Sequence, residues 1–441
     1  MNKINIEQGR LDINTHGGLP LVGSLLSNIT LPMSFQNGRS NKVSDSDYIF
    51  SMLGLLSVGK SSFADISSYK NNRMFTHCLD LDKLPSEESL RQNLNRLAGH
   101  STTFTAVSNL NSSLLKTMEY SAIPCKTGNY FPLDLDVTPL ENSKSKKEGV
   151  SCTYKLFDGF APMMAYLGRI GYLVDSEFRE GKQHCQKGTA AFLESAITIS
   201  NSLLPEESKI LIRMDGGNDA GENIEVMFNS GSYWIVKRNL RKEPKSYWLE
   251  IAQSMGELVS DDGIERVYRG VVSHIDAKCE GEGVASDIVF EVIETYATDN
   301  GQMKMLIDIA VDTYWTNLPE TPEIVIDLYH DHGTSEQFHS EFKTDMGVER
   351  LPSGSFKTNK LVFQLAMVAY NILRRISIDI VEFAPERVKS KGVKRRRIKT
   401  VLRDIINSGC QFIKKAGTVT IRFGRYCIFY RAIQTLYLRY Q

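Results

Sequence analysis

Residues 130–137 form a run in which acidic residues alternate with apolar ones from Leu133 to Val137, a period of two that predicts a β-strand. Successive side chains of a strand point to opposite faces of its sheet. Leu133, Leu135 and Val137 therefore share one face, and Asp134 and Asp136 share the other. Two uses of the acidic face stay open from this pattern alone, a solvated surface or a functional site.

The neighbouring segments predict an α/β core around this strand. Residues 161–173 are an apolar run interrupted by glycines and predict one following strand, and residues 190–204 have helical periodicity. Residues 209–215 form a β-rich run that ends in Asp215 before two glycines. Functional sites in α/β sheets are built at strand ends, although Asp-Gly is also a common turn.

The regions on either side have other patterns. In the first 120 residues, Leu90, Leu94 and Leu97 follow Ser86 at helical spacing. This part is predicted to be helical, either as a helix-turn-helix-like DNA-binding unit or as a plain helical subdomain. The later chain predicts many strands up to residue 318, then helices after Pro322, then a basic and largely helical tail. The predicted parts are a helical N-terminal DNA-binding region 1–120, a first core part 121–221, a β-rich insertion 222–320, a second core part 321–380 and a basic helical C-terminal region 381–441.

Composition limits the class of protein. Lys+Arg and Asp+Glu both total 52 in 441 residues, which argues against a uniformly basic nucleic-acid protein. Residues 387–403 nevertheless hold nine Lys/Arg, either a solvated helix face or a surface that contacts phosphates. The start has no signal-peptide pattern, and the longest apolar stretch, residues 361–373, is too short to span a bilayer. The seven Cys form no C-x2-C pair, so we expect no zinc site and a reducing cytoplasm.

Residues 329–343 contain a third acidic position. Thr334 or Ser335 can cap a helix that begins near Glu336, and His339 and Lys343 then share a face with Glu336. Glu341 lies about 140° further around such a helix, so Glu336 is the better candidate for a site.

Three carboxylates from distant parts of the chain suit hard divalent cations. Asp134 or Asp136, together with Asp215 and Glu336, offers the oxygen ligands that Mg²⁺ or Mn²⁺ bind, and two such ions roughly 4 Å apart can flank a phosphodiester. Lys343 would then hold a phosphate.

The spacing of this block resembles a known signature. Tyr329-x2-His332-x3-Glu336-x6-Lys343 is similar to the Tyr-x2-Arg-x3-Glu-x6-Lys signature of DDE insertion-sequence transposases. The resemblance covers roughly residues 45–441, and several longer runs look like the group called insertion sequence 1380. The runs that carry this closer resemblance are 133–138, 177–189, 213–217, 333–347, 349–354 and 359–374.

The resemblance implies a fold and an activity. It implies an RNase H-like catalytic core with a β-rich insertion between the second and third acids. It also implies a transposase that cuts double-stranded DNA at the terminal inverted repeats of its own element and joins the ends to target DNA. A homodimer on DNA, in the bacterial cytoplasm at the nucleoid and without a membrane, is expected. The alternatives are an RNase H-like nuclease without strand transfer and a non-catalytic DNA-binding protein derived from a transposase.

The resemblance also implies roles for residues. Asp136, Asp215 and Glu336 become the catalytic triad and hold two Mg²⁺ or Mn²⁺ ions. Asp136 is favoured over Asp134 because Thr138 follows it at the Asp-x-Thr spacing of the family.

DNA contacts are predicted on two grounds. Tyr329, His332 and Lys343 are predicted from the signature, where His332 replaces a constant Arg by a group that titrates near pH 6.5; Arg350 is a second source of that charge. Charge alone suggests a further set, namely Arg91, Lys237, Arg238, Arg395, Arg396 and Arg397. Trp234 and Trp315 are expected to pack in the core rather than stack on a base, and His184 is expected to be structural.

Overall fold

The computed structural model describes residues 4, 6–9, 11–27, 29, 43–277, 284–297, 302–386 and 392–441. The chain divides into two compact units, each built from separate stretches of sequence. One, here called the helical unit, comprises Met1–Met118, Glu141–Val150 and Ser340–Gln441; the other, the sheet unit, comprises Glu119–Leu140 and Ser151–His339.

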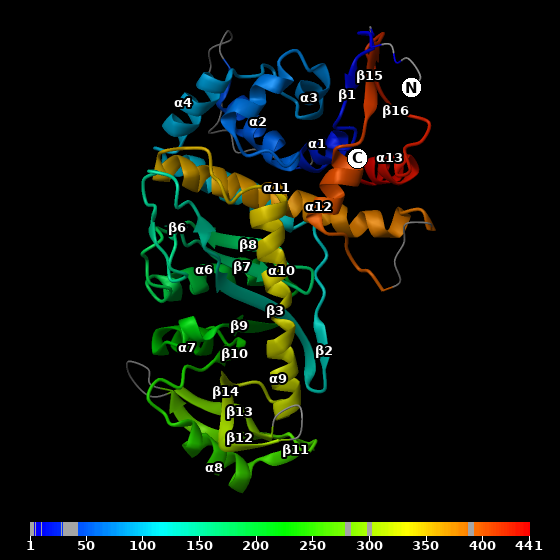
Figure 1. Cartoon of the computed structure of the whole chain (residues 1–441). Helices are drawn as coiled ribbons and strands as arrows, with labels where there is room; N and C mark the ends of the chain where they lie inside the picture. The colour runs from blue at the N-terminus through cyan, green and yellow to red at the C-terminus, as the bar shows by residue number, and fades with distance from the viewer. Residues whose placement is uncertain are drawn as a thin grey trace. The chain divides into compact units, whose positions relative to one another are not determined.

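The sheet unit is built on one large mixed sheet with the strand order β11-β12-β13-β14-β10-β9-β3-β7-β8 (Figure 1). β3 pairs antiparallel with β7, and β7 with β8, whereas β9 and β10 run parallel to β3. Helices α6 and α7 supply the crossovers that parallel neighbours require. The core elements are β2 (Ile123–Cys125), β3 (Gly128–Val137), β7 (Met163–Leu167), β8 (Tyr172–Glu177), α6 (Thr189–Leu203), β9 (Lys209–Met214), α7 (Gly221–Asn229) and β10 (Tyr233–Lys237).

Three antiparallel strands followed by two parallel ones, with this order, make an RNase H-like core, as the resemblance implied. Smaller elements accompany it. They are β4 (Leu140–Glu141), where the chain passes between units, β5 (Ser151–Cys152), β6 (Asp158–Phe160) and the short helix η3 (Gly216–Asn218).

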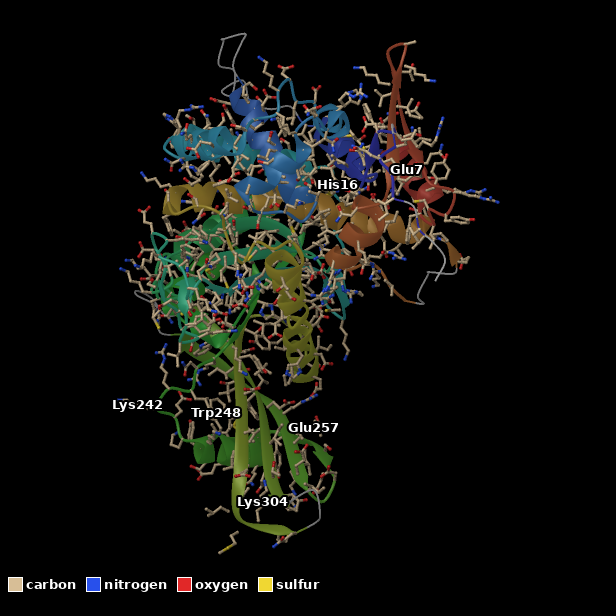
Figure 2. The ribbon with its side chains drawn as sticks, turned by 45° about the horizontal axis from the view of Figure 1, so that its top comes forward. Glu7, His16, Lys242, Trp248, Glu257 and Lys304 are labelled. Carbon is tan, nitrogen blue, oxygen red and sulfur yellow. The ribbon has the colours of Figure 1, made fainter. Side chains whose placement is uncertain are left out.

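The insertion lies between the core strands and the helices that follow. It contains α8 (Lys245–Met255), β11 (Glu257–Asp261), β12 (Glu265–Ala277), β13 (Val284–Ala297) and β14 (Met303–Thr316). Trp248 of α8 packs against Phe290 of β13, and Lys304 marks the far end of β14 (Figure 2). The predicted start at residue 222 is too early, because α7 and β10 belong to the core: β10 pairs with β9 along residues 233–236.

The predicted single strand over residues 161–173 is in fact a hairpin, β7 and β8. Gly168 and Gly171 both have positive φ, near +75°, and form the turn that the strand interpretation overlooked. Gly171 is also required by space, because a Cβ there would lie 2.2 Å from the ring of Phe338. The turn therefore seats the helix that carries Phe338.

Two helices cover the acidic face of the core sheet. α9 (Pro322–Asp331) packs Val325, Ile326 and Leu328 onto core residues of β3, β9 and β10. α10 (Thr334–Ser340) begins two residues earlier than the predicted start near Glu336, and Phe338 packs on Tyr166 of β7.

The helical unit is organised around the long helix α11 (Phe356–Phe383), which packs against α2 and α5 (Figure 1). Ser86 caps α4 as the sequence predicted, by accepting a hydrogen bond from the backbone of Ser89. The other elements of its N-terminal part are β1 (Ile13–Asn14), α1 (Leu19–Ser27), α2 (Asp45–Ser57), the 3-10 helix η2 (Phe63–Tyr69), α3 (Arg73–Cys78), α4 (Glu87–Leu97) and α5 (Ser101–Leu115).

α11 is the one helix among the described residues that is long and apolar enough to cross a membrane by length and composition. Its apolar window is 83% buried inside the protein, as in the core helix of a soluble protein.

The C-terminal part of the helical unit is less helical than predicted. Residues 410–423 form the hairpin of β15 and β16, and β15 also pairs with β1. Part of the basic run, residues 387–391, lies outside the described residues. The elements of this part are the π-helical turn η4 (Glu341–Asp345), α12 (Ile398–Val401), the π-helical turn η6 (Leu402–Ile406), β15 (Cys410–Lys415), β16 (Thr418–Phe423) and α13 (Tyr430–Arg439).

Candidate active site at the ends of two core strands

The register of β3 and β9 arranges four charged side chains in two layers on one face of the sheet. Asp134 is the partner of Arg213 across the parallel pair. Asp136 and Asp215 lie two residues further along their strands, so they point to the same face as this pair. One layer joins an acid to a base, and the next brings two acids together.

The first layer is a buried ion pair. Both oxygens of Asp134 accept hydrogen bonds from Arg213, at 2.6 and 2.8 Å, and the two side chains are 2% and 1% exposed. Burial alone would raise the pKa of Asp134, but Arg213 and then His332 outweigh it and hold this pKa at about 2. Arg213 also donates to the carbonyl of Leu328 at 2.6 Å, which fastens α9 to the sheet.

The second layer carries unbalanced negative charge. Burial and then the charge of Asp136 raise the pKa of Asp215, with Asn218 and His332 opposing the shift. The pKa of Asp136 is lowered, because His339 and His332 outweigh burial. Asp136 keeps 26% of its side chain exposed, whereas Asp134 is enclosed and neutralised. The geometry therefore favours Asp136 over Asp134 as the reactive acid.

The loop after β9 orients Asp215. Its Oδ1 accepts a 2.7 Å hydrogen bond from the amide of Asn218, whose own Oδ1 is buried without a hydrogen-bond partner among the described residues. A Cβ on Gly217 would lie 3.3 Å from Oδ1 of Asp215 and 3.4 Å from Sγ of Cys185. The glycine thus keeps open the space beside the carboxylate.

A second loop packs against this one. Arg179, 1% exposed, donates to Glu177 and to the carbonyl of Cys185. Cys185 in turn donates from its thiol to the carbonyl of Gly217 at 2.9 Å. The conspicuous run 177–189 therefore supports the Asp215 loop, while His184 is exposed.

Two histidines from the helical cover approach the acids. Nδ1 of His332 lies 3.1 Å from Oδ1 of Asp134. Nε2 of His339 lies 3.4 Å from Oδ2 of Asp136, and its ring packs edge-on against Tyr166. Sequence reasoning put His339 on the face of Glu336 but gave it no role, and it gave none to Arg213. An arginine inside an apolar strand run was the available signal for the latter.

The third predicted acid, Glu336, is exposed on α10, one helical turn before His339. No ion pair or hydrogen bond of the described residues joins it to Asp136 or Asp215. Glu341 is fully buried and binds Arg374 and Arg395, at 3.1 and 2.6 Å, so it has no capacity for a metal. Of the two glutamates, Glu336 alone is accessible to a ligand.

The donor set fits divalent cations. Burial and the charge of Asp136 raise the pKa of Asp215, and carboxylates are the usual oxygen ligands of Mg²⁺ or Mn²⁺. The unpaired Oδ1 of Asn218 and the unpaired ring nitrogens of His339 are further donors at the same place. The described residues hold no preformed cluster of three or more His, Cys, Asp or Glu. Of the three predicted acids, Asp136 and Asp215 are the two that the structure brings together.

The predicted DNA-contacting residues have varied surroundings. The ring of Tyr329 packs against Tyr314 at a tilted angle, and burial followed by the charge of Asp215 raises the pKa of Tyr329. Lys343 belongs to the helical unit and pairs with Glu349 there at 3.3 Å. Arg350 is an exposed residue of that same unit.

The three consecutive arginines of the basic run form ion pairs within the helical unit. Arg395 is 13% exposed and binds Glu341, and Arg396 is 14% exposed, 3.7 Å from Asp404. Arg397 is 44% exposed and donates hydrogen bonds to both carboxylate oxygens of Asp345. This burial argues against direct phosphate contact by Arg395 and Arg396.

The other predicted basic residues also form ion pairs and differ in how far they are exposed. Arg91 is exposed and pairs with Glu88, and Lys237 pairs with Asp312 at 2.8 Å. Arg238 is 14% exposed, bonded to Glu243 and packed over the rings of Trp248 and Trp315. The two tryptophans proposed for the core, Trp234 and Trp315, are 1% and 7% exposed, which confirms core packing.

The comparison with family models agrees with the predicted class. The sequence matches the family model described as "Transposase DDE domain group 1" over residues 40–440. No curated protein matches the sequence. Among solved structures, the fold matches a piggyBac transposase synaptic complex with hairpin DNA at a TM-score of 0.42 and 10% identity. That match covers 89% of this chain and 79% of the other.

The family model spans nearly the whole chain, from before α2 to the end of α13, and so includes β3, β9 and α10 with their acids. The chain therefore belongs to the transposase DDE domain family.

Proposed function

We propose that this protein is a transposase that cuts DNA at the ends of its element and joins the freed 3′-hydroxyls to target DNA. The observation that carries the proposal is the pairing of Asp136 with Asp215 at adjacent strand ends. A fully buried, neutralised layer, Asp134 with Arg213, lies directly behind this pair. Such an arrangement holds two acids in a fixed position and leaves one side open to a substrate.

Asp136, Asp215 and Glu336 are the residues proposed to hold two Mg²⁺ or Mn²⁺ ions. When bound, these ions supply an activated water or 3′-hydroxyl and neutralise the leaving oxygen. The protein contributes rigidity: Asn218 fixes one oxygen of Asp215, and Arg213 fixes α9 above the sheet. Glu336 is exposed on α10, so we propose that it joins the carboxylate pair when metal and DNA bind.

The substrate we propose is double-stranded DNA, comprising the terminal inverted repeats and the target. Two ends must be held together for joining, so a homodimer on DNA is part of the proposal. Tyr329, Lys343 and Arg397 are the proposed phosphate contacts, whereas His332, 10% exposed beside Asp134, is enclosed like Arg395 and Arg396. The closer assignment to the insertion sequence 1380 group rests on the sequence runs around the three acids and stays a proposal, as does a place at the bacterial nucleoid.

An assay with cloned ends tests this function. The full chain is incubated with a linear DNA that carries both inverted repeats, a supercoiled target plasmid and Mg²⁺, and products are followed on sequencing gels. We expect cleavage at the repeat ends and joined products. Asp215→Asn and Glu336→Gln should abolish both, with DNA affinity in gel shifts unchanged.

The outcomes separate the alternatives. Cleavage without joined products would identify a nuclease and overturn strand transfer. Specific DNA binding without any metal-dependent cleavage would identify a non-catalytic DNA-binding protein. Cleavage that survives both substitutions would show that the acids were wrongly assigned.

A further inference from the structure

The imidazole of His339 is buried without satisfying its hydrogen bonds. The residue is 6% exposed, and neither ring nitrogen has a hydrogen-bond partner among the described residues. Leaving a buried polar atom unpaired costs about 1–3 kcal/mol. A buried nitrogen that is directed at a candidate metal ligand indicates that a missing partner completes its environment.

The distance between His339 and Asp136 suits a shared cation. Nε2 lies 3.4 Å from Oδ2 of Asp136, at ion-pair range but without hydrogen-bond alignment. Two neighbouring ligands about 2.1 Å from one octahedral ion lie about 3 Å apart. The two atoms are therefore within a few tenths of an ångström of the separation that one bound ion imposes.

Packing fixes the ring in this direction. The edge of His339 meets the ring of Tyr166, with centroids 5.1 Å apart, and the next residue back, Phe338, fills the space left by Gly171. Both contacts are made by core strands or by their turn. The nitrogen is thus held toward Asp136 without a hydrogen bond.

The other imidazole in this region has a different environment. His332 approaches Asp134, whose two oxygens already bind Arg213. A cation there would meet the fixed positive charge of the guanidinium. His332 therefore serves as a matched control: a second buried histidine beside a neighbouring acid, outside the second layer.

We propose that His339 is a nitrogen ligand of the divalent cation held by Asp136, so that the metal site has mixed nitrogen and oxygen donors. The inference rests on the proposed metal-dependent function and adds a ligand to the three acids. Imidazole nitrogen is a ligand of transition metals, and Mn²⁺, the first of their divalent series, accepts it more readily than Mg²⁺, which prefers oxygen. The site should then bind Mn²⁺ more tightly than Mg²⁺, and His339 should contribute to that preference.

Pulsed electron paramagnetic resonance on the Mn²⁺-loaded full chain tests the ligand directly. A coordinated histidine nitrogen modulates the electron spin echo of Mn²⁺, and labelling histidines with ¹⁵N changes the modulation frequencies without altering the protein. We expect ¹⁴N modulation in the wild type and its replacement by the ¹⁵N pattern after labelling. The signal should be absent in His339→Gln and present in His332→Gln.

Calorimetric titration with Mn²⁺ and Mg²⁺ gives a second readout. We expect His339→Gln to weaken Mn²⁺ binding about tenfold or more, with a smaller effect on Mg²⁺. Circular dichroism and thermal unfolding establish that each variant is folded. The ¹⁵N-labelling experiment is made on the wild type, so its result does not depend on how any variant folds.

Two results would overturn the inference while leaving the proposed function intact. These are Mn²⁺ bound to the wild type without nitrogen modulation, and modulation that persists in His339→Gln. The proposed metal site itself would be overturned if the wild-type chain bound no Mn²⁺. It would also be overturned if the Asp136→Asn variant bound Mn²⁺ as tightly as the wild type does.

Discussion

At the scale of single residues, the two layers of the sheet assign different roles to two acids of the same strand. Asp134 is enclosed and neutralised by Arg213, whereas Asp136 is partly exposed beside another acid. The sequence predicted that both acids share a face, and spacing to Thr138 favoured Asp136. It did not predict the partner of Asp134, because strand register is a non-local property.

Substitutions of the two acids should therefore separate stability from activity. Asp134→Asn leaves the guanidinium of Arg213 buried without its counter-charge and should reduce the free energy of unfolding by about 3–5 kcal/mol. Asp136→Asn relieves repulsion with Asp215 and should change it by less than about 1 kcal/mol while abolishing cleavage. Urea unfolding measures the stability of each variant, and gel assays measure its cleavage activity. Equal destabilisation by the two substitutions would contradict the different roles of the two acids.

The decrease of the unfolding free energy at low pH should also depend on Asp134. Its pKa is about 2 in the folded chain, below the ordinary value of 3.8, so folding is favoured when the carboxyl is ionised. This contribution, roughly 2 kcal/mol, is present above about pH 4 and disappears as the pH falls toward 2. Unfolding free energies measured across this range should fall more steeply in the wild type than in Asp134→Asn. Parallel curves would rule out the depressed pKa.

At the scale of elements, local periodicity predicted β3, β9 and α6, since each repeats its apolar residues at its own period. It failed where structure depends on a turn or a distant partner. The hairpin of β7 and β8 was taken for one strand, and β10 was assigned to the insertion because only its pairing with β9 reveals its place. The β15–β16 hairpin was similarly hidden in a basic segment.

The turn between β7 and β8 should control how α10 sits on the sheet. Gly171→Ala combines a positive φ with a Cβ that would lie 2.2 Å from the Phe338 ring. Gly231→Ala is the matched control, with φ of +70° and nothing within 4 Å. The control should cost about 1 kcal/mol in unfolding free energy, and Gly171→Ala roughly 1–3 kcal/mol more. Equal losses would mean that Phe338 moves aside freely.

At the scale of the whole molecule, a net charge of zero conceals a strong segregation. Residues 410–441 contain six Lys/Arg and no acid, so the rest of the chain carries a matching negative excess. Lys414, Lys415 and Arg422 on the β15–β16 hairpin are exposed, in contrast to Arg395 and Arg396. We therefore expect this hairpin, rather than Arg395 and Arg396, to contact DNA phosphates.

Charge reversal tests this surface. Lys414→Glu together with Lys415→Glu should weaken binding to any DNA sequence and reduce the slope of log affinity against log salt by about 2, because each phosphate contact contributes about 0.9. Lys242→Glu, in an exposed loop of the sheet unit, is the control and should leave the slope unchanged (Figure 2). Identical slopes for all three proteins would exclude the hairpin as a DNA contact.

The central claim is that Asp215, paired with Asp136, is a direct ligand of the catalytic metal. Replacing Asp215 with Cys exchanges an oxygen ligand for a sulfur, which Mn²⁺ tolerates better than Mg²⁺. The decisive measurement is the rate of end cleavage by folded Asp215→Cys in each metal. The account predicts no cleavage with Mg²⁺ and restored cleavage with Mn²⁺. The account would be contradicted if Asp215→Cys cleaved DNA with Mg²⁺ at the rate of the wild type, or if it cleaved DNA with neither metal.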